Sequence, residues 1–301
     1  MLDFQVKDVI FKSPIFAASG TFGYGDEIAE NIDIEKIGCV ITKSITVKAR
    51  KGNPHPRIHQ AGVGMLNAIG LANVGVKQFC NKKLPKLNKL KTHYMVSIAG
   101  SSMEEYEEVL SQIELFSGNH IGYEINVSCP NVKEGGMEFG LNENMVCDLT
   151  SRLRGITKKL LFVKLSPNVT SIENIAKKAE EAGADGISAV NTFVGLGIDY
   201  KTGKFELSTI YGGVSGPPIK PLALAKVNKI YNKINIPIIG MGGISSFRDI
   251  VEFIRVGASM VQVGTLNYRD PSVICKYYDD LSKFILDNKI SSISDLIGDC
   301  R

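Results

Sequence analysis

The sequence lacks the cysteine patterns of metal sites and of disulfide frameworks. Its six cysteines are scattered through 301 residues, and no two of them form a Cys-x-x-Cys pair. This absence excludes the usual sequence signatures of an iron–sulfur cluster or a structural zinc site on this chain. Widely separated thiols also suit a reducing compartment, so we expect a cytoplasmic protein without a disulfide framework.

Long apolar runs, a leader segment and a large net charge are missing as well. The chain does not begin with a basic segment followed by an apolar stretch, so we expect no signal peptide. No stretch approaches the length that crosses a bilayer, so we expect no membrane association. The net charge of +4 is small for this length. It argues against a dedicated nucleic-acid surface and leaves room for a local cationic pocket.

The histidines give no sign of a metal centre. Their spacing matches no metal-ligand pattern, and we expect no metal on this chain. We assign none of them to catalysis, and we expect His93 and His120 to be surface or edge residues.

Short apolar runs alternate with longer amphipathic ones, which is the pattern of repeated βα units. We expect a single domain over residues 1–301, folded as a (β/α)₈ TIM barrel. The expected strands are 15–18, 39–42, 94–98, 122–126, 161–165, 186–190, 236–240 and 260–264. The clearest helices are 103–115, 145–158, 172–182, 221–232, 247–256 and 273–286, with Ser171 as an N-cap and Gly183 as a stop for the third.

Two segments depart from the simple repeat. Residues 3–13 are expected to form a small N-terminal hairpin that plugs the bottom of the barrel. Residues 194–214 contain a turn signal at 199–204, between two extended pieces. They predict a β-hairpin inserted after the sixth strand.

Every expected strand ends in a polar or glycine-rich stretch. Catalytic groups of such barrels lie at the carboxyl-terminal ends of the strands, so these residues are candidates for one site. A buried lysine also requires an anionic partner, and lysines lie in or next to two of the strands. The candidates are Ser19, Lys43, Ser44, Ser97, Asn126, Cys129, Lys164, Asn191, Thr192, Gly242, Gly243, Gly264 and Thr265.

The last two strand ends predict a phosphate site. Gly242-Gly243 and Gly264-Thr265 follow the seventh and eighth strands, where these barrels bind phosphate through backbone N–H groups. The phosphate belongs either to a substrate or to a flavin mononucleotide. Lys164 favours the flavin, since its charge would stabilise an anionic reduced ring. The alternative is a lysine paired with a core carboxylate, for which Glu124 is the only candidate in a neighbouring strand.

The segment from Asn126 to Asn131 combines two carboxamides with a thiol, Cys129. Carboxamides can recognise a planar heterocycle, and a thiol beside them can take a proton from its ring. The glycines of residues 132–140 would let that loop close over the site. A buried cysteine before a turn is the plain alternative. Asn67 offers either a second wall for the heterocycle or an ordinary capped turn.

These motifs together resemble those of the dihydroorotate dehydrogenases, over nearly the whole chain. The most specific stretches are Gly52-Asn53-Pro54-His55-Pro56-Arg57, Leu66-Asn67-Ala68-Ile69-Gly70-Leu71, Asn126-Val127-Ser128-Cys129-Pro130-Asn131, Val163-Lys164-Leu165-Ser166-Pro167-Asn168 and Gly240-Met241-Gly242-Gly243. A cysteine at the position of the base resembles the soluble class 1 enzymes. The wording of the motifs is most similar to class 1B, the catalytic subunit of an NAD-linked enzyme of pyrimidine biosynthesis.

The resemblance implies one FMN per chain and the oxidation of dihydroorotate to orotate. Cys129 would remove a ring proton, with Lys43 as a second catalytic residue. FMN would be held by Ser19, Lys43, Ser44, Ser97, Asn126, Lys164, Val190, Gly216, Gly242, Gly243, Gly264 and Thr265. Substrate would be held by Lys43, Asn67, Ala68, Ile69, Gly70, Leu71, Asn126, Asn131, Asn191 and Thr192. Ser97 and Ser44 depart from the asparagine and alanine usual in class 1B.

The resemblance also implies a partner subunit that carries FAD and an iron–sulfur cluster, in a heterotetramer built on a homodimer of this chain. Without a GxGxxG fingerprint or a cysteine cluster, the chain itself would not reach NAD. The nearest alternative is a class 1A homodimer that uses fumarate. More distant alternatives are a phosphate-binding aldolase with Lys164 as a Schiff-base lysine, and a non-catalytic scaffold.

Overall fold

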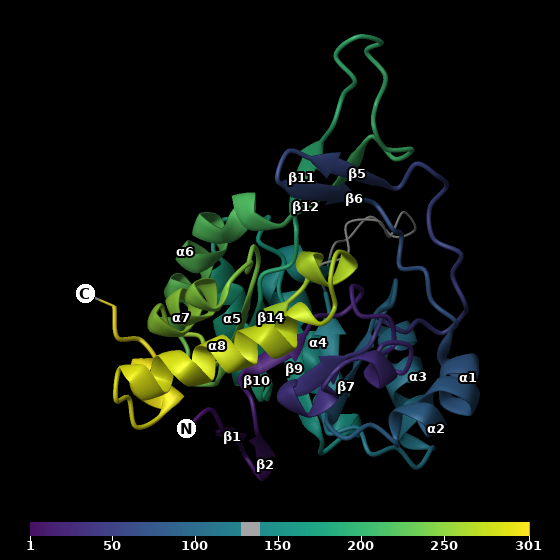
Figure 1. The fold of residues 1–301 in the computed structure, drawn as a ribbon. Helices are drawn as coiled ribbons and strands as arrows, with labels where there is room; N and C mark the ends of the chain where they lie inside the picture. The colour runs from purple at the N-terminus through teal and green to yellow at the C-terminus, as the bar shows by residue number, and fades with distance from the viewer. Residues whose placement is uncertain (128–138, 301) are drawn as a thin grey trace.

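Parallel strands close into a barrel that is wrapped by helices (Figure 1). The computed structural model describes residues 1–127 and 139–300. The barrel strands are β3 (Ile15–Ala17), β4 (Cys39–Ile41), β7 (His93–Ile98), β8 (Gly122–Asn126), β9 (Leu160–Lys164), β10 (Gly186–Ala189), β13 (Ile238–Met241) and β14 (Met260–Val263). Each pairs in parallel with the next one along the chain, and β14 pairs with β3 to close the ring. The predicted barrel is confirmed, each strand within two residues of its predicted ends.

The helices cover the outside of the barrel. They are α1 (Val76–Gln78), which passes through a π-helical turn (Phe79–Lys83) into α2 (Leu84–Leu87), then α3 (Met103–Glu114), α4 (Glu143–Ile156), α5 (Ile172–Glu181), α6 (Lys220–Tyr231), α7 (Phe247–Arg255) and α8 (Val273–Asp287). Ser171 stands at the N-cap of α5 but its side chain makes no capping bond there. Gly183, at φ +93°, follows the end of α5 as predicted.

The N-terminal hairpin closes the amino-terminal end of the barrel. Strands β1 (Phe4–Val6) and β2 (Val9–Phe11) pair antiparallel. Val6 and Phe11 are buried in one cluster with Phe16, Met95 and other side chains of the barrel interior. The Phe11 and Phe16 rings are 4.9 Å apart. The predicted plug is therefore confirmed, and it leaves the opposite end of the barrel for a ligand.

A second sheet lies over that opposite end (Figure 1). Its strands, in spatial order, are β11 (Phe193–Leu196), β12 (Tyr211–Ser215), β6 (Gly64–Asn67) and β5 (Ile58–Ala61). The hairpin β11–β12 is the predicted insertion after the sixth barrel strand, and its turn projects away from the barrel. Strands β5 and β6 were not predicted, because four-residue strands between glycines have the composition of loops. Among the described helices, none is long and apolar enough to cross a membrane.

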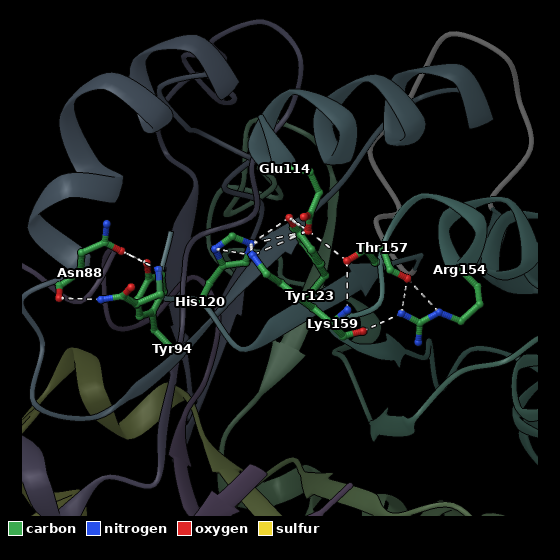
Figure 2. A network of polar contacts seen from close by, with 9 residues as sticks. Asn88, Tyr94, Glu114, His120, Tyr123, Arg154, Thr157 and Lys159 are labelled. Carbon is green, nitrogen blue, oxygen red and sulfur yellow. Dashed lines mark hydrogen bonds and ion pairs between the residues drawn. The ribbon is translucent and has the colours of Figure 1, made fainter. Parts of the chain in front are cut away.

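The prediction that His120 is a surface or edge residue is wrong. Only 2 % of its surface is exposed. Its Nε2 lies 2.8 Å from the Tyr123 hydroxyl and 2.9 Å from Lys159 Nζ (Figure 2). The Tyr123 hydroxyl and the Thr157 hydroxyl both donate to Glu114 Oε1, at 2.7 and 2.9 Å. This network ties the end of α3 to the beginnings of β8 and β9, a long-range arrangement that no local pattern around the histidine reveals.

Burial makes His120 a pH-dependent element of the fold. Desolvation, and then the nearby charge of Lys159, lower its pKa from 6.5 to about 4, against the opposing charge of Glu114. Between those two pH values the unfolded chain binds a proton that the folded chain does not. The contribution of neutral His120 to the free energy of unfolding is therefore fully present above about pH 6.5. It is lost as the pH falls to about 4, and this shift amounts to roughly 3 kcal/mol.

We predict that His120→Gln flattens this part of the acid limb, whatever it does to stability at neutral pH. The measurement is the free energy of unfolding in urea at several pH values across that range. His55→Gln, at an exposed position, is the control and should keep the slope of the parent chain. Equal slopes for the parent chain and His120→Gln would contradict the prediction.

Candidate active site

A cavity of about 1150 Å³ opens at the carboxyl-terminal ends of the barrel strands. Its walls come from the barrel on one side and from β5, β6 and β12 on the other. The predicted residues that line it are Ser19, Lys43, Ser44, Asn67, Ala68, Ile69, Gly70, Leu71, Asn126, Lys164, Val190, Asn191, Thr192, Gly216, Gly242, Gly243, Gly264 and Thr265. Residues more than 240 positions apart thus meet in one site. Cys129 and Asn131 lie outside the described residues.

Ser97 is the one described candidate that does not line the cavity. It is fully buried on β7, behind Ser44, and the two hydroxyls are 2.8 Å apart. Asn126 Nδ2 donates to Ser44 Oγ at 3.2 Å, and Asn191 Nδ2 lies 3.4 Å from Asn126 Oδ1. Ser97 is therefore the inner end of a hydrogen-bonded chain that orients two carboxamides on the cavity wall. The cofactor contact expected of Ser97 stays a prediction, and its hydroxyl reaches the cavity wall only through Ser44.

Lys164 and Glu124 face each other inside the barrel. Lys164 Nζ lies 3.7 Å from Glu124 Oε1, and both side chains are at least nine-tenths buried. Glu124 Oε2 accepts hydrogen bonds from Ser188 Oγ at 2.9 Å and from Gln262 Nε2 at 2.7 Å. The alternative that sequence reasoning placed second is thus present: the lysine pairs with a core carboxylate. It also lines the cavity, so the pairing does not remove it from the site.

Gln262 is a cavity residue that sequence reasoning missed. It is 1 % exposed on β14, and its Oε1 atom is buried without a hydrogen-bond partner among the described residues. Glu124 Oε1 shares that property. Buried acceptors are normally satisfied, so these two oxygens mark a place where a ligand donor or an ordered water would fit. The signal was available, since Gln262 is the polar residue in the apolar strand Met260–Val263.

Lys43 adds a second cation to the cavity. It is half-buried, and burial followed by the charge of Arg57 lowers its pKa below the ordinary lysine value. Its backbone N–H donates to Gly23 O at 3.1 Å, which fixes the chain where it leaves β4. Burial and Arg57 both disfavour the ammonium form, and the charge of Glu27 opposes them only in part. An anion bound beside Lys43 would therefore favour the ammonium form and be attracted by it.

The glycines form a cradle of the kind that takes a phosphate. Gly242 and Gly243 have φ values of +121° and +83°, and a Cβ on Gly243 would lie 2.8 Å from Lys220 N. A Cβ on Gly264 would meet only Ala18 Cβ, at 3.6 Å, and would occupy the cavity itself. Thr265 Oγ1 donates to Ser215 Oγ at 2.8 Å across this end. The volume, the cradle and the two lysines fit an anionic nucleotide cofactor together with a small second ligand.

Fold and cavity define a (β/α)₈ barrel with a large ligand site at the carboxyl-terminal end of its strands. Residues 1–285 match the family model described as dihydroorotate dehydrogenase. The chain belongs to that family, as its motifs predicted.

Curated relatives and a solved structure agree with this assignment. A Bacteroides fragilis protein named "Dihydroorotate dehydrogenase B (NAD(+)), catalytic subunit" is 42% identical, over 99% of this chain and 98% of its own length. A Citrifermentans bemidjiense protein of the same name is 43% identical, over 97% and 96%. The crystal structure of DHODH in complex with ferulenol from Eimeria tenella superposes with a TM-score of 0.81 at 26% identity, covering 99% of this chain and 88% of the other.

The Glu124–Lys164 pair yields a prediction about stability. Removing either charge leaves the other buried without its counter-ion, which costs on the order of 3 kcal/mol. Glu124→Gln and Lys164→Met should therefore each lower the free energy of unfolding, and the double variant should lose less than the sum. We expect a coupling energy of about 1 kcal/mol or more, from urea unfolding of the cofactor-free chain.

The surface pair Lys36–Asp279, whose atoms are 2.7 Å apart, is the matched control. Its coupling energy should be clearly smaller than that of the buried pair, because water screens exposed charges. Additive losses at Glu124 and Lys164 would show that the buried charges do not depend on each other.

Proposed function

We propose that this chain oxidises dihydroorotate to orotate in pyrimidine biosynthesis, as the FMN-binding catalytic subunit of an NAD-linked enzyme. The observation that carries the proposal is the meeting of Lys43, Asn67, Asn126, Asn191 and Thr192 in one cavity with the glycine cradle. Family membership and relatives named as NAD(+)-linked catalytic subunits support it. They leave no support for the aldolase and scaffold alternatives.

The cavity divides into a cofactor part and a substrate part. Gly216, Gly242, Gly243, Gly264 and Thr265 would hold the FMN phosphate through backbone N–H groups. Ser19, Ser44, Val190 and Lys164 would contact the rest of the cofactor, which when bound supplies a hydride acceptor. Ser97 would act through Ser44.

The substrate part presents a cation and carboxamides to a small anionic heterocycle. Lys43 would bind the substrate carboxylate through an ion pair. The carboxylate would stabilise the ammonium form of Lys43, which burial disfavours. Asn67, with Ala68 to Leu71, and the pair Asn126 and Asn191 would fix the ring through hydrogen bonds in its plane. Asn67 Nδ2 already donates to Gly213 O at 3.3 Å, which limits its rotation. Asn131 and Thr192 would complete this set.

Cys129 would act as the general base. Its thiolate would take a proton from one ring carbon while the adjacent carbon gives up a hydride, so that the ring gains a double bond. A free thiol has a pKa near ~8.5, so at neutral pH the site must favour the thiolate. Cys129 lies outside the described residues, and its role rests on the sequence motif.

Electrons would leave through a partner subunit carrying FAD and an iron–sulfur cluster. The word "subunit" in the relatives' names supports a partner, and we propose a heterotetramer built on a homodimer of this chain, acting in the cytoplasm. A class 1A enzyme, which passes electrons to fumarate, is the competing assignment.

We predict that the purified chain is yellow, with one FMN per chain, and that dihydroorotate bleaches it without oxygen. The reduced protein should be reoxidised by NAD⁺ in the presence of the co-expressed partner, and only slowly by fumarate. Visible spectra and stopped-flow absorbance give both results. A colourless protein, or a yellow one that dihydroorotate leaves unchanged, would remove the proposal, while rapid reoxidation by fumarate alone would indicate class 1A.

Replacing the proposed base tests the assignment of roles. Cys129→Ala should lower the rate of bleaching by on the order of 10²–10⁴-fold, because a placed base contributes about that much. The variant should keep its FMN, since the cofactor contacts lie elsewhere. Cys147→Ala, a thiol on α4, is the control and should behave like the parent chain. A normal rate in Cys129→Ala would reject this residue as the base.

A further inference from the structure

Charge is strongly segregated along this chain. Residues 36–103 contain no aspartate or glutamate, although the whole chain has 31 of them. The same segment carries Lys36, Lys43, Lys48, Arg50, Lys51, Arg57, Lys77, Lys82, Lys83, Lys86, Lys89 and Lys91. The near-balanced total therefore hides a cationic region of 68 residues.

Some of these cations are neutralised by acidic residues from outside the segment. Lys36 pairs with Asp279, Lys83 with Asp26 and Glu27, and Lys91 with Glu35. These ion pairs tie the segment to residues 26–35 and, through Lys36, to α8.

Eight cations of the segment form no ion pair among the described residues: Lys43, Lys48, Arg50, Lys51, Arg57, Lys77, Lys82 and Lys89. Four of these lie in or beside one surface groove. Lys48, Arg50, Lys77 and Lys82 form no ion pair within the part of the chain that the structure describes, and three of them are exposed, with Arg50 half-exposed. Glu105 feels the charges of Lys48 and Arg50, but its Oε2 already accepts hydrogen bonds from Ser101 N and Oγ, at 2.7 and 2.6 Å. We call Lys48, Arg50, Lys77 and Lys82 the basic face.

A groove of about 330 Å³ is lined by Lys77 and Lys82 of the basic face, and by Ala49, which Lys48 and Arg50 flank in the sequence. On one side its lining is apolar, from Val47, Ala49 and Val74, and on the other it is polar, from Lys77, Gln78, Asn81 and Lys82 on the helical segment that begins at Val76. The two sides are joined by backbone hydrogen bonds: Arg50 and Asn73 exchange a pair at 2.9 and 3.0 Å, and Val76 N donates to Thr46 O at 3.0 Å. The groove is thus a preformed surface that combines apolar and cationic side chains, as protein interfaces do.

The groove and the active-site cavity are lined by consecutive stretches of the same chain segment. Residues 69–72 line the cavity, and Val74 and Gly75 line the groove, so one short stretch of chain separates the two. A protein seated in the groove would therefore stand close to whatever the cavity holds. Electron transfer needs this kind of proximity, and a site for an unrelated partner would not.

We propose that the basic face is the docking surface for an acidic face of the electron-accepting partner subunit. This inference rests on the proposed function, since it requires such a partner. Opposite charges on the two faces would steer the encounter and fix the register, while the apolar side of the groove would supply contact area. A nucleic acid is the less fitting occupant, because the groove is small and partly apolar.

The test uses Lys77→Glu/Lys82→Glu in the full chain, with the co-expressed and purified NAD-linked partner subunit. We expect the dissociation constant for the partner to rise at least tenfold, and the parent complex to weaken as ionic strength increases. NAD⁺ reduction at limiting partner should fall accordingly. Lys229→Glu/Lys233→Glu, two exposed lysines on and after α6, is the matched control and should bind like the parent.

The outcomes separate this inference from the proposed function. Bleaching by dihydroorotate should be the same in both variants and the parent chain, and its absence in the parent would reject the function itself. Normal bleaching with unchanged partner affinity in Lys77→Glu/Lys82→Glu would overturn the docking surface. An equal loss in the Lys229→Glu/Lys233→Glu control would overturn it too, as would a charge-dependent affinity for duplex DNA or RNA with the partner unaffected.

Discussion

Closure of the parallel barrel is the constraint on which the rest of this structure depends. Because β3 and β14 pair at the seam, all carboxyl-terminal strand ends point to one rim. Lys43, Asn126, Lys164 and Gly264 come from strands far apart in sequence, yet they reach the same cavity. The N-terminal hairpin seals the other end with Val6 and Phe11, so the interior is open toward the site alone. The second sheet can then cover the opening without contributing to the barrel.

Buried charge inside the barrel follows from that closure. Lys164 could not lie in an apolar interior unaccompanied, and Glu124 on the neighbouring strand, held by Ser188 and Gln262, provides the counter-charge. The carboxylate also lies behind the lysine as seen from the cavity. It therefore offsets part of the positive potential that a bound anionic ring would experience, while fixing the position of the ammonium group. Lys164 therefore contacts a buried carboxylate on one side and the cavity on the other.

Sequence reasoning succeeded where a local pattern has a single structural meaning. Buried parallel strands are short apolar runs, and the residues that follow them must reach the rim, so both the barrel and most of the cavity wall were predictable. It failed where contacts between distant segments decide. His120 is buried only because α3, β8 and Lys159 enclose it, and Ser97 is withdrawn from the cavity only because Ser44 stands before it. Strand β6 pairs with the edge of β12, and β5 pairs with β6. The sequence of residues 58–67 alone does not predict this pairing with a distant strand.

The net charge of +4 also fails to describe the local charge of the surface. It was a sound argument against a surface dedicated to nucleic acid, because that argument concerns the whole molecule. Docking responds instead to the local potential, which in water at physiological salt reaches only about 8 Å from its source. Over that range Lys77 and Lys82 act on a molecule bound in the groove, whereas every acidic residue of the chain lies outside the cationic segment. A small net charge is therefore compatible with a strongly cationic local surface. Because only a short stretch of backbone separates the groove from the cavity, the local charge there matters more for docking than the net charge of the chain.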